Sequence, residues 1–248
     1  MQNGIEETVM NPNRRIAITA GVLFILATAA SLVGSAVLGT ALDGPDYLSR
    51  ISVDGNRLLV SALLSFVAAC GSAGIAIALY PVLRKFNEGL ALGSVGFRLI
   101  EAVFYIVGTL CLLSLFALSR QSAGATGQDA NDVETLGHLL LTAKDLAGFV
   151  FGVLAFCIGG GSYYVVFYRS RLIPRWLSAW GLIAMVTLFA AAIITLFDGE
   201  PYSVSGSLVF LAFPIALQEM VLAVWLIVKG FNPAAVASLP ASAQVERA

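Results

Sequence analysis

Three ionisable residues lie inside long apolar stretches of the sequence, where charged side chains are rare. Arg98 and Glu101 are three residues apart, a spacing that places both on one face of a helix and suits an ion pair. Glu219 follows Gln218 in a later apolar stretch. At about 1.5 Å of rise per residue, the three charged residues lie near the middle of their helices. They are therefore expected at a similar depth in a bilayer.

A charged side chain at the bilayer centre costs about 2.5–3.5 kcal/mol on insertion scales, so these residues must face inward and meet partners. We predict a midplane ligand or proton cluster of Arg98, Glu101, Gln218 and Glu219. Two interpretations remain open: a salt-bridge clamp that joins two helices, or a site for a substrate, an ion or a proton. If all three groups ionise, the cluster carries a net charge of −1. We predict that Glu219, which has no cation on its own helix, is the protonated carboxyl and donates a hydrogen bond.

Other chemistry finds little support in the sequence. His138 is the only histidine, so histidine-rich metal sites and Ser-His catalysis within the membrane are excluded. The three cysteines, Cys70, Cys111 and Cys157, lie among apolar residues, where a thiol behaves as a small hydrophobe. No phosphate-binding or dinucleotide-binding glycine loop is present. We expect no metal and no cofactor, and an enzyme that acts on lipid is the less favoured class.

The composition indicates an integral membrane protein. The chain has 248 residues, of which 58% are hydrophobic and only 12% charged, with a mean hydropathy of +0.89. Soluble domains carry about 25% charged residues, so a water-soluble globule is excluded. The net charge of −1 argues against a nucleic-acid partner. Six stretches reach the about 20 apolar residues that a crossing needs: Ile16–Leu42, Leu58–Leu83, Leu90–Leu118, Leu146–Tyr168, Trp176–Phe197 and Leu208–Val228.

The positions of the basic residues predict the orientation, because cytoplasmic segments are enriched in Lys and Arg. With a cytoplasmic N-terminus, nine basic residues fall inside: Arg14, Arg15, Arg84, Lys85, Arg169, Arg171, Arg175, Lys229 and Arg247. Four fall outside: Arg50, Arg57, Arg120 and Lys144. We therefore predict an all-α, polytopic bundle of six transmembrane helices with both termini cytoplasmic.

The predicted domain organisation has a single membrane domain over residues 16–231, between disordered cytoplasmic segments at 1–15 and 232–248. The longest loop is expected from Ser119 to Gly137, with a helix that begins near Asn131 or Asp132. Small residues recur every four positions in the first helix, at Ala27, Ser31, Ser35 and Gly39. Such faces let helices approach closely and would also permit a homo-oligomer. The run Gly159–Gly161 indicates either a close helix crossing or a hinge.

Three stretches carry a resemblance to a known family. They are NRRIAITAGVLFILATAASLVG at 13–34, NEGLALGSVGFRLIEA at 87–102, and SRLIPRWLSAWGLI at 170–183. Together they resemble the bacterial family classed as domain of unknown function 4386. The middle stretch is the specific one and contains Arg98 and Glu101. The resemblance implies a polytopic protein of the bacterial cytoplasmic membrane and carries no activity, substrate or cofactor.

The first functional hypothesis is therefore a small-molecule or ion carrier, or a ligand-binding membrane protein, whose polar cavity is lined by the midplane cluster. Its partners would be the lipid bilayer and a small molecule, lipid or ion. The alternative is a non-catalytic scaffold or sensor whose buried charges only lock the third and sixth helices together. A carrier requires a cavity that reaches the cluster, whereas a scaffold does not.

Overall fold

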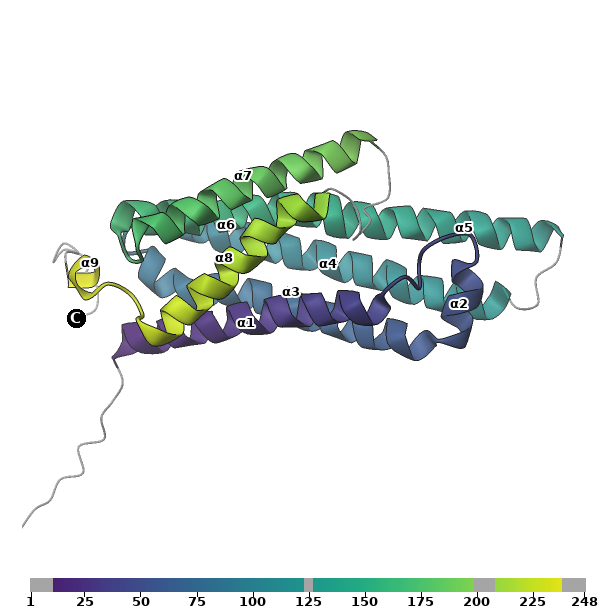
Figure 1. The fold of residues 1–248 in the computed structure, drawn as a ribbon, viewed down its shortest axis with the longest axis horizontal. Helices are drawn as coiled ribbons and strands as arrows, with labels where there is room; N and C mark the ends of the chain where they lie inside the picture. Colours follow the sequence, from purple (N-terminus) through teal and green to yellow (C-terminus); the bar gives the residue numbers. More distant parts are fainter. Residues whose placement is uncertain (1–10, 123–126, 199–207, 238–248) are drawn as a thin grey trace, which may run out of the picture.

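The computed structural model describes residues 11–122, 127–198 and 208–237, and this part of the chain contains helices and no strand. The long helices run side by side as an elongated bundle (Figure 1). They are α1 (Pro12–Leu38), α3 (Gly55–Leu83), α4 (Glu88–Ser122), α6 (Val153–Ser170), α7 (Arg175–Asp198) and α8 (Leu208–Val228).

Shorter helices complete the fold. They are α2 (Tyr47–Val53), α5 (Gln128–Asp145), the π-helix η1 (Leu146–Gly152) and α9 (Pro233–Ala237). Helices α5, η1 and α6 follow one another without a break and form one helical rod of 43 residues, Gln128–Ser170. A π-helix has i→i+5 hydrogen bonds in place of i→i+4 bonds and is uncommon, so its seven residues mark a local irregularity within this rod.

Five helical segments in the described part of the chain are long and apolar enough to cross a membrane. They are Pro12–Leu38, Gly55–Leu83, Glu88–Gln121, Gln128–Ser170 and Arg175–Phe197, and Ala212–Val228 is a shorter apolar helix. Many large apolar side chains on these helices face outward, among them Leu63, Ile183 and Val186. An apolar exterior is what a lipid surrounding requires. The chain is thus an all-helical, multi-pass membrane protein.

The first helix differs from its predicted bounds at both ends. Helix α1 begins at Pro12, inside the segment predicted to be disordered, because the Asn11 side chain accepts a hydrogen bond from the Asn13 N–H at 3.0 Å and Pro12 suits the first turn. It ends at Leu38 rather than Leu42, since Gly39 has a φ of 52°. Helix α9 lies within the predicted C-terminal tail, and the remainder of both predicted tails falls outside the described residues.

The predicted long loop from Ser119 to Gly137 is wrong over most of its length, because α4 continues to Ser122 and α5 begins at Gln128. The helix predicted to begin near Asn131 or Asp132 is confirmed, with a slightly earlier start. A second apolar core lies near these extensions and is formed by Tyr47, Ile51, Leu58, Ala62, Leu112 and Leu115. In Figure 1, α2 and the adjoining parts of α4 and α5 lie past the end of α7. Burial and then the Glu134 carboxylate raise the pKa of the Tyr47 phenol in this core.

Small residues set the contacts of the main bundle. Helix α1 packs on α3 and α8, whereas α4 packs on α3 and α6. A Cβ added at Gly71 would lie 2.9 Å from the Cβ of Ala27, so α1 and α3 meet closely at the predicted small-residue face. A Cβ at Gly21 would lie 2.8 Å from the Ala223 carbonyl oxygen, which marks the crossing of α1 and α8. These two crossings place α1 between α3 and α8.

Candidate functional site

Arg98 lies in the interior of the bundle and does not face lipid. Its side chain on α4 is only 2% exposed. The Nε atom donates a hydrogen bond to the Ser72 carbonyl oxygen of α3 at 3.3 Å. Its guanidinium carbon lies 4.7 Å from the ring centroid of Phe156 on α6, within cation–π range. Arg98 therefore connects three helices: it belongs to α4, its hydrogen bond reaches α3, and its ring contact reaches α6.

The absence of a side chain at Gly159 permits this contact between α4 and α6. A Cβ at Gly159 would lie 3.0 Å from Arg98 Cγ and 3.1 Å from the Arg98 backbone nitrogen. A Cβ at Gly160 would lie 2.5 Å from Met185 Cε on α7, whereas nothing lies within 4 Å of one at Gly161. The close-packing interpretation of the glycine run is thus confirmed for its first two members.

The predicted pair of Arg98 and Glu101 is present. Arg98 Nη1 and Glu101 Oε2 are 3.2 Å apart, and the Glu101 side chain is 2% exposed. The i, i+3 spacing on α4 brings the two groups to one face. Ser94 lies one turn before Arg98 and is also fully buried, so this face of α4 presents three polar side chains to the interior.

Glu219 is buried at a different helix contact. Its Oε2 accepts a hydrogen bond from Thr28 Oγ1 of α1 at 3.4 Å, and the residue is 9% exposed. Among the described residues, no Lys or Arg forms an ion pair with Glu219. The direct Arg98–Glu219 clamp is therefore not formed, because α8 packs on α1 and α7 while α4 packs on α3 and α6.

Gln218 has a structural position that the sequence did not indicate. Its Oε1 accepts a hydrogen bond from the Tyr164 hydroxyl of α6 at 2.5 Å. Its Nε2 donates to the Leu177 carbonyl oxygen of α7 at 3.1 Å. Both polar groups of this fully buried amide thus bind neighbouring helices. Of the four predicted site residues, Gln218 is the one whose side chain already has protein partners at both ends.

The interior also holds polar atoms that have no hydrogen-bond partner in the protein. Within the described residues they include Ser72 Oγ, Ser94 Oγ, Arg98 Nη1, Glu101 Oε2, Tyr163 OH and Glu219 Oε1. They come from α3, α4, α6 and α8. Buried polar atoms are normally paired, so a group of unpaired ones requires an explanation. The ion pair of Arg98 and Glu101 is close, but its two facing atoms are not aligned as a hydrogen bond.

Sequence reasoning missed Ser72, Ser94 and Tyr163. Neutral polar residues are common in membrane helices, so none of them is conspicuous by type. Spacing would have indicated two of them, because Ser94 is four residues before Arg98 and Tyr163 is four residues after Gly159. Ser72 becomes visible only in the fold, which brings its carbonyl oxygen to Arg98.

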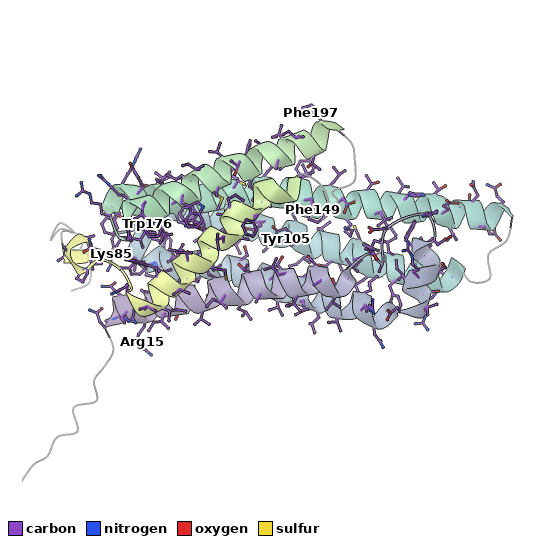
Figure 2. The ribbon with its side chains drawn as sticks, in the orientation of Figure 1. Arg15, Lys85, Tyr105, Phe149, Trp176 and Phe197 are labelled. Atoms are coloured by element: carbon purple, nitrogen blue, oxygen red, sulfur yellow. The ribbon has the colours of Figure 1, made fainter. Side chains whose placement is uncertain are left out.

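Two pockets open at the end of the bundle where α1 begins, and neither is lined by Arg98, Glu101 or Glu219. One holds about 580 Å³ around the α6–α7 turn and the end of α8. The other holds about 260 Å³ between the α3–α4 turn and α6. Trp176 and Lys85 are seen at this end, while Tyr105 and Phe149 lie near the middle of the molecule (Figure 2). Arg98 and Glu101 are each 2% exposed and Glu219 is 9% exposed, so in this conformation the charged cluster is enclosed by helices.

These features define a class: a helical, multi-pass membrane protein with an enclosed group of ionisable side chains. The family described as Domain of unknown function (DUF4386) matches residues 19–230. The chain belongs to this family, as the three resembling stretches predicted. Comparisons with curated proteins and with solved structures found no match for the chain.

Proposed function

We propose that the protein is a carrier for a proton or a small cationic solute, which binds at a site formed by Arg98, Glu101 and Glu219. The observation that carries the proposal is the group of buried polar atoms that lack a hydrogen-bond partner among the described residues, two of which, Arg98 Nη1 and Glu101 Oε2, are held only as an ion pair. In lipid, each unsatisfied polar group costs several kcal/mol, so a fold that retains several of them requires a compensating role. Binding a polar species at the cluster would satisfy these atoms.

The charge of the cluster supports a cationic ligand. The interior holds one arginine, Arg98, and two carboxyl groups, Glu101 and Glu219, so full ionisation leaves one uncompensated negative charge in a lipid-surrounded interior. A bound proton or a monovalent cation makes the cluster neutral. Glu219 is the natural acceptor, because its Oε1 is unpaired and Glu101 already has Arg98 at 3.2 Å.

Neither of the two end pockets reaches the cluster, so a carrier must open a path to it by movement of helices, and the segment beside the cluster has features suited to such a movement. The π-helix η1 precedes α6, which contributes Phe156 and Tyr163 to the interior. π-helical turns are frequent at functional sites. At the junction, a Cβ on Gly152 would lie 2.9 Å from Tyr105 Cε1 of α4. A shift within η1 would therefore move α6 against the face of α4 that carries Arg98.

We further propose six spans with both termini on the cytoplasmic side of a bacterial cytoplasmic membrane. Helix α8 has 21 residues, which at about 1.5 Å each is enough to cross about 30 Å of hydrocarbon. The distribution of basic residues, nine on one side against four on the other, supports this orientation.

A scaffold or sensor without transport is the second candidate. The observation that favours it is the enclosure of the cluster, since the side chains of Arg98, Glu101 and Glu219 are all buried. In that case the buried groups would serve only to hold helices together. Substitution of Glu219 separates the two candidates.

The test is uptake into proteoliposomes by the wild type, Glu219→Gln and Glu88→Gln. Glu88 is an exposed residue in the first turn of α4 and provides the matched control. An internal pH-sensitive dye reports proton movement, and a panel of small cations reports solute movement. The carrier proposal expects Glu219→Gln to keep its thermal unfolding midpoint and lose uptake, while Glu88→Gln retains uptake. A wild type without uptake, together with a Glu219→Gln variant that unfolds at lower temperature, would support the scaffold instead.

A further inference from the structure

A second site lies at the end of the bundle, apart from the charged cluster. It is a pocket of about 580 Å³ between the α6–α7 turn, the end of α8 and the start of α9. Its lining comprises Arg171, Leu172, Ile173, Pro174, Arg175, Trp225, Lys229, Gly230, Phe231, Asn232 and Pro233. Three of these residues are basic and none is acidic. The pocket therefore has a single sign of charge.

Hydrogen bonds join the two segments that line this pocket, the α6–α7 turn and the segment after α8. The Asn232 N–H donates to the Leu172 carbonyl oxygen at 2.8 Å, and Asn232 Nδ2 donates to the Arg171 carbonyl oxygen at 3.4 Å. Arg171 ends α6 with a φ of 57°. The segment after α8 is thereby fixed to the turn between α6 and α7, so the pocket is a defined feature of the fold.

The basic side chains are available to a ligand. Arg171, Arg175 and Lys229 are exposed, and none forms an ion pair with an acidic residue in the described ranges. Helix α7 begins at Arg175, so its N-terminal dipole adds positive potential at the same place. Arg14 binds the carbonyl oxygens of Leu226 and Ile227 at the end of α8, which offsets the negative end of that helix.

We propose that this pocket binds an anionic phosphate group, carried either by a phospholipid headgroup or by a soluble phosphate compound. Arginine and lysine are the side chains that recognise phosphate, and basic pockets between membrane helices bind anionic headgroups. Trp225 and Phe231 provide an apolar wall beside the charges, which suits the glycerol and acyl portion of a lipid. The proposal is independent of transport at the charged cluster.

The experiment uses full-length protein in nanodiscs, with Trp225 as the reporter. Trp176→Phe and Trp180→Phe remove the other two tryptophans. Quenching of Trp225 is measured as brominated phosphatidylglycerol replaces unbrominated phosphatidylcholine, with brominated phosphatidylcholine as the neutral comparison. A second arm adds inorganic phosphate or pyrophosphate and follows displacement of the quenching lipid.

The decisive variant combines Arg171→Gln, Arg175→Gln and Lys229→Gln. Its matched control combines Arg15→Gln, Arg84→Gln and Lys85→Gln, which removes the same charge from exposed positions. Arg15 and Lys85 are seen at the same end of the bundle (Figure 2). Each basic residue near an anionic headgroup contributes about fivefold in affinity, so the pocket variant should lose on the order of a hundredfold. The control should change far less. If the pocket variant does not fold, Lys229→Gln alone should lose about fivefold.

The outcomes separate the sources of phosphate. Selective quenching by phosphatidylglycerol that depends on the pocket residues and resists added phosphate assigns the site to lipid. Displacement by millimolar phosphate or pyrophosphate assigns it to a soluble compound. Equal loss in the pocket variant and the control, or equal quenching by phosphatidylcholine, would overturn the proposal.

Discussion

Arg98 occupies an interior position whose stability depends on its partners. It pairs with Glu101, binds the Ser72 carbonyl oxygen and lies over the Phe156 ring. Removal of one member of a buried pair leaves the other charge uncompensated, which strongly lowers the stability of the fold. Removal of both members lowers it far less. The interactions of Arg98 can therefore be separated by substitution.

We expect Arg98→Gln to lower the free energy of unfolding by about 3 kcal/mol, since Glu101 would remain buried without its cation. Thermal or denaturant unfolding in detergent measures the loss. The double variant Arg98→Gln with Glu101→Gln should recover a large part of it. Arg84→Gln, which alters an exposed arginine, is the control and should change stability little. A double variant no more stable than the single one would contradict this account.

Protonation of the cluster gives a second residue-scale prediction. Glu101 has Arg98 beside it, whereas Glu219 has only the Thr28 hydroxyl and no ion pair among the described residues. We expect Glu219 to be the protonated carboxyl at neutral pH. Infrared difference spectroscopy across pH should show a protonated carboxyl band that disappears in Glu219→Gln. A band that persists there and disappears in Glu101→Gln would assign the proton to the other residue.

The burial of the charged residues and the Arg98–Glu101 pair were predictable at this scale, whereas their partners on other helices were not. A charge in an apolar stretch must face inward, so burial of Arg98, Glu101 and Glu219 follows from the sequence and the cost of exposure. Which helix each one meets depends on the order of helices around the bundle, which periodicity does not encode. For this reason a clamp between the third and sixth helices stayed an open alternative, and the Thr28 hydroxyl was not predicted as the partner of Glu219.

At the scale of helices, the glycine run provides an internal comparison. Gly159 contacts Arg98 closely, whereas Gly161 has open space around it. We expect Gly159→Ala to separate α4 from α6 and lower the unfolding midpoint, because the added methyl would lie 3.1 Å from the Arg98 backbone nitrogen, which cannot move freely. Gly161→Ala should leave the midpoint unchanged or raise it, since alanine favours a helix by about 1 kcal/mol in water. Equal effects of the two substitutions would show that close packing at Gly159 is unimportant.

The positions of the apolar helices were predicted well because a crossing requires a minimum apolar length. The regions beyond the apolar stretches were predicted poorly. Polar residues after Leu118 indicated a loop, but α4 continues as a helix to Ser122, beside an apolar core that contains Leu112, Leu115, Tyr47 and Ile51. Tertiary contacts of this kind override local composition, and a single sequence does not reveal them.

At the scale of the whole molecule, the proposed orientation can be tested by labelling. Native Cys70, Cys111 and Cys157 are first replaced by alanine, and single cysteines are then placed at Lys85 and Leu136, both exposed at opposite ends of the bundle. An impermeant maleimide applied to intact cells stripped of their outer membrane should label the cysteine at 136 and not the one at 85. Labelling of the cysteine at 85 alone would show that the orientation is the opposite of the one proposed.

The π-helix has a consequence for the tolerated length of the chain. A turn closed by i→i+5 bonds contains one more residue than an α-helical turn needs, so Leu146–Gly152 accommodates a surplus residue without interrupting the rod. Deletion of Leu146 should let this turn relax to an α-helical turn. Lys144 and Phe156 should then keep their present orientations around the helix axis. Deletion of Ile194, exposed within α7, should instead rotate all later residues of that helix by about 100°. The unfolding midpoint should fall when Ile194 is deleted and stay unchanged when Leu146 is deleted. In that case η1 is a position where a transmembrane helix can lose one residue without loss of stability.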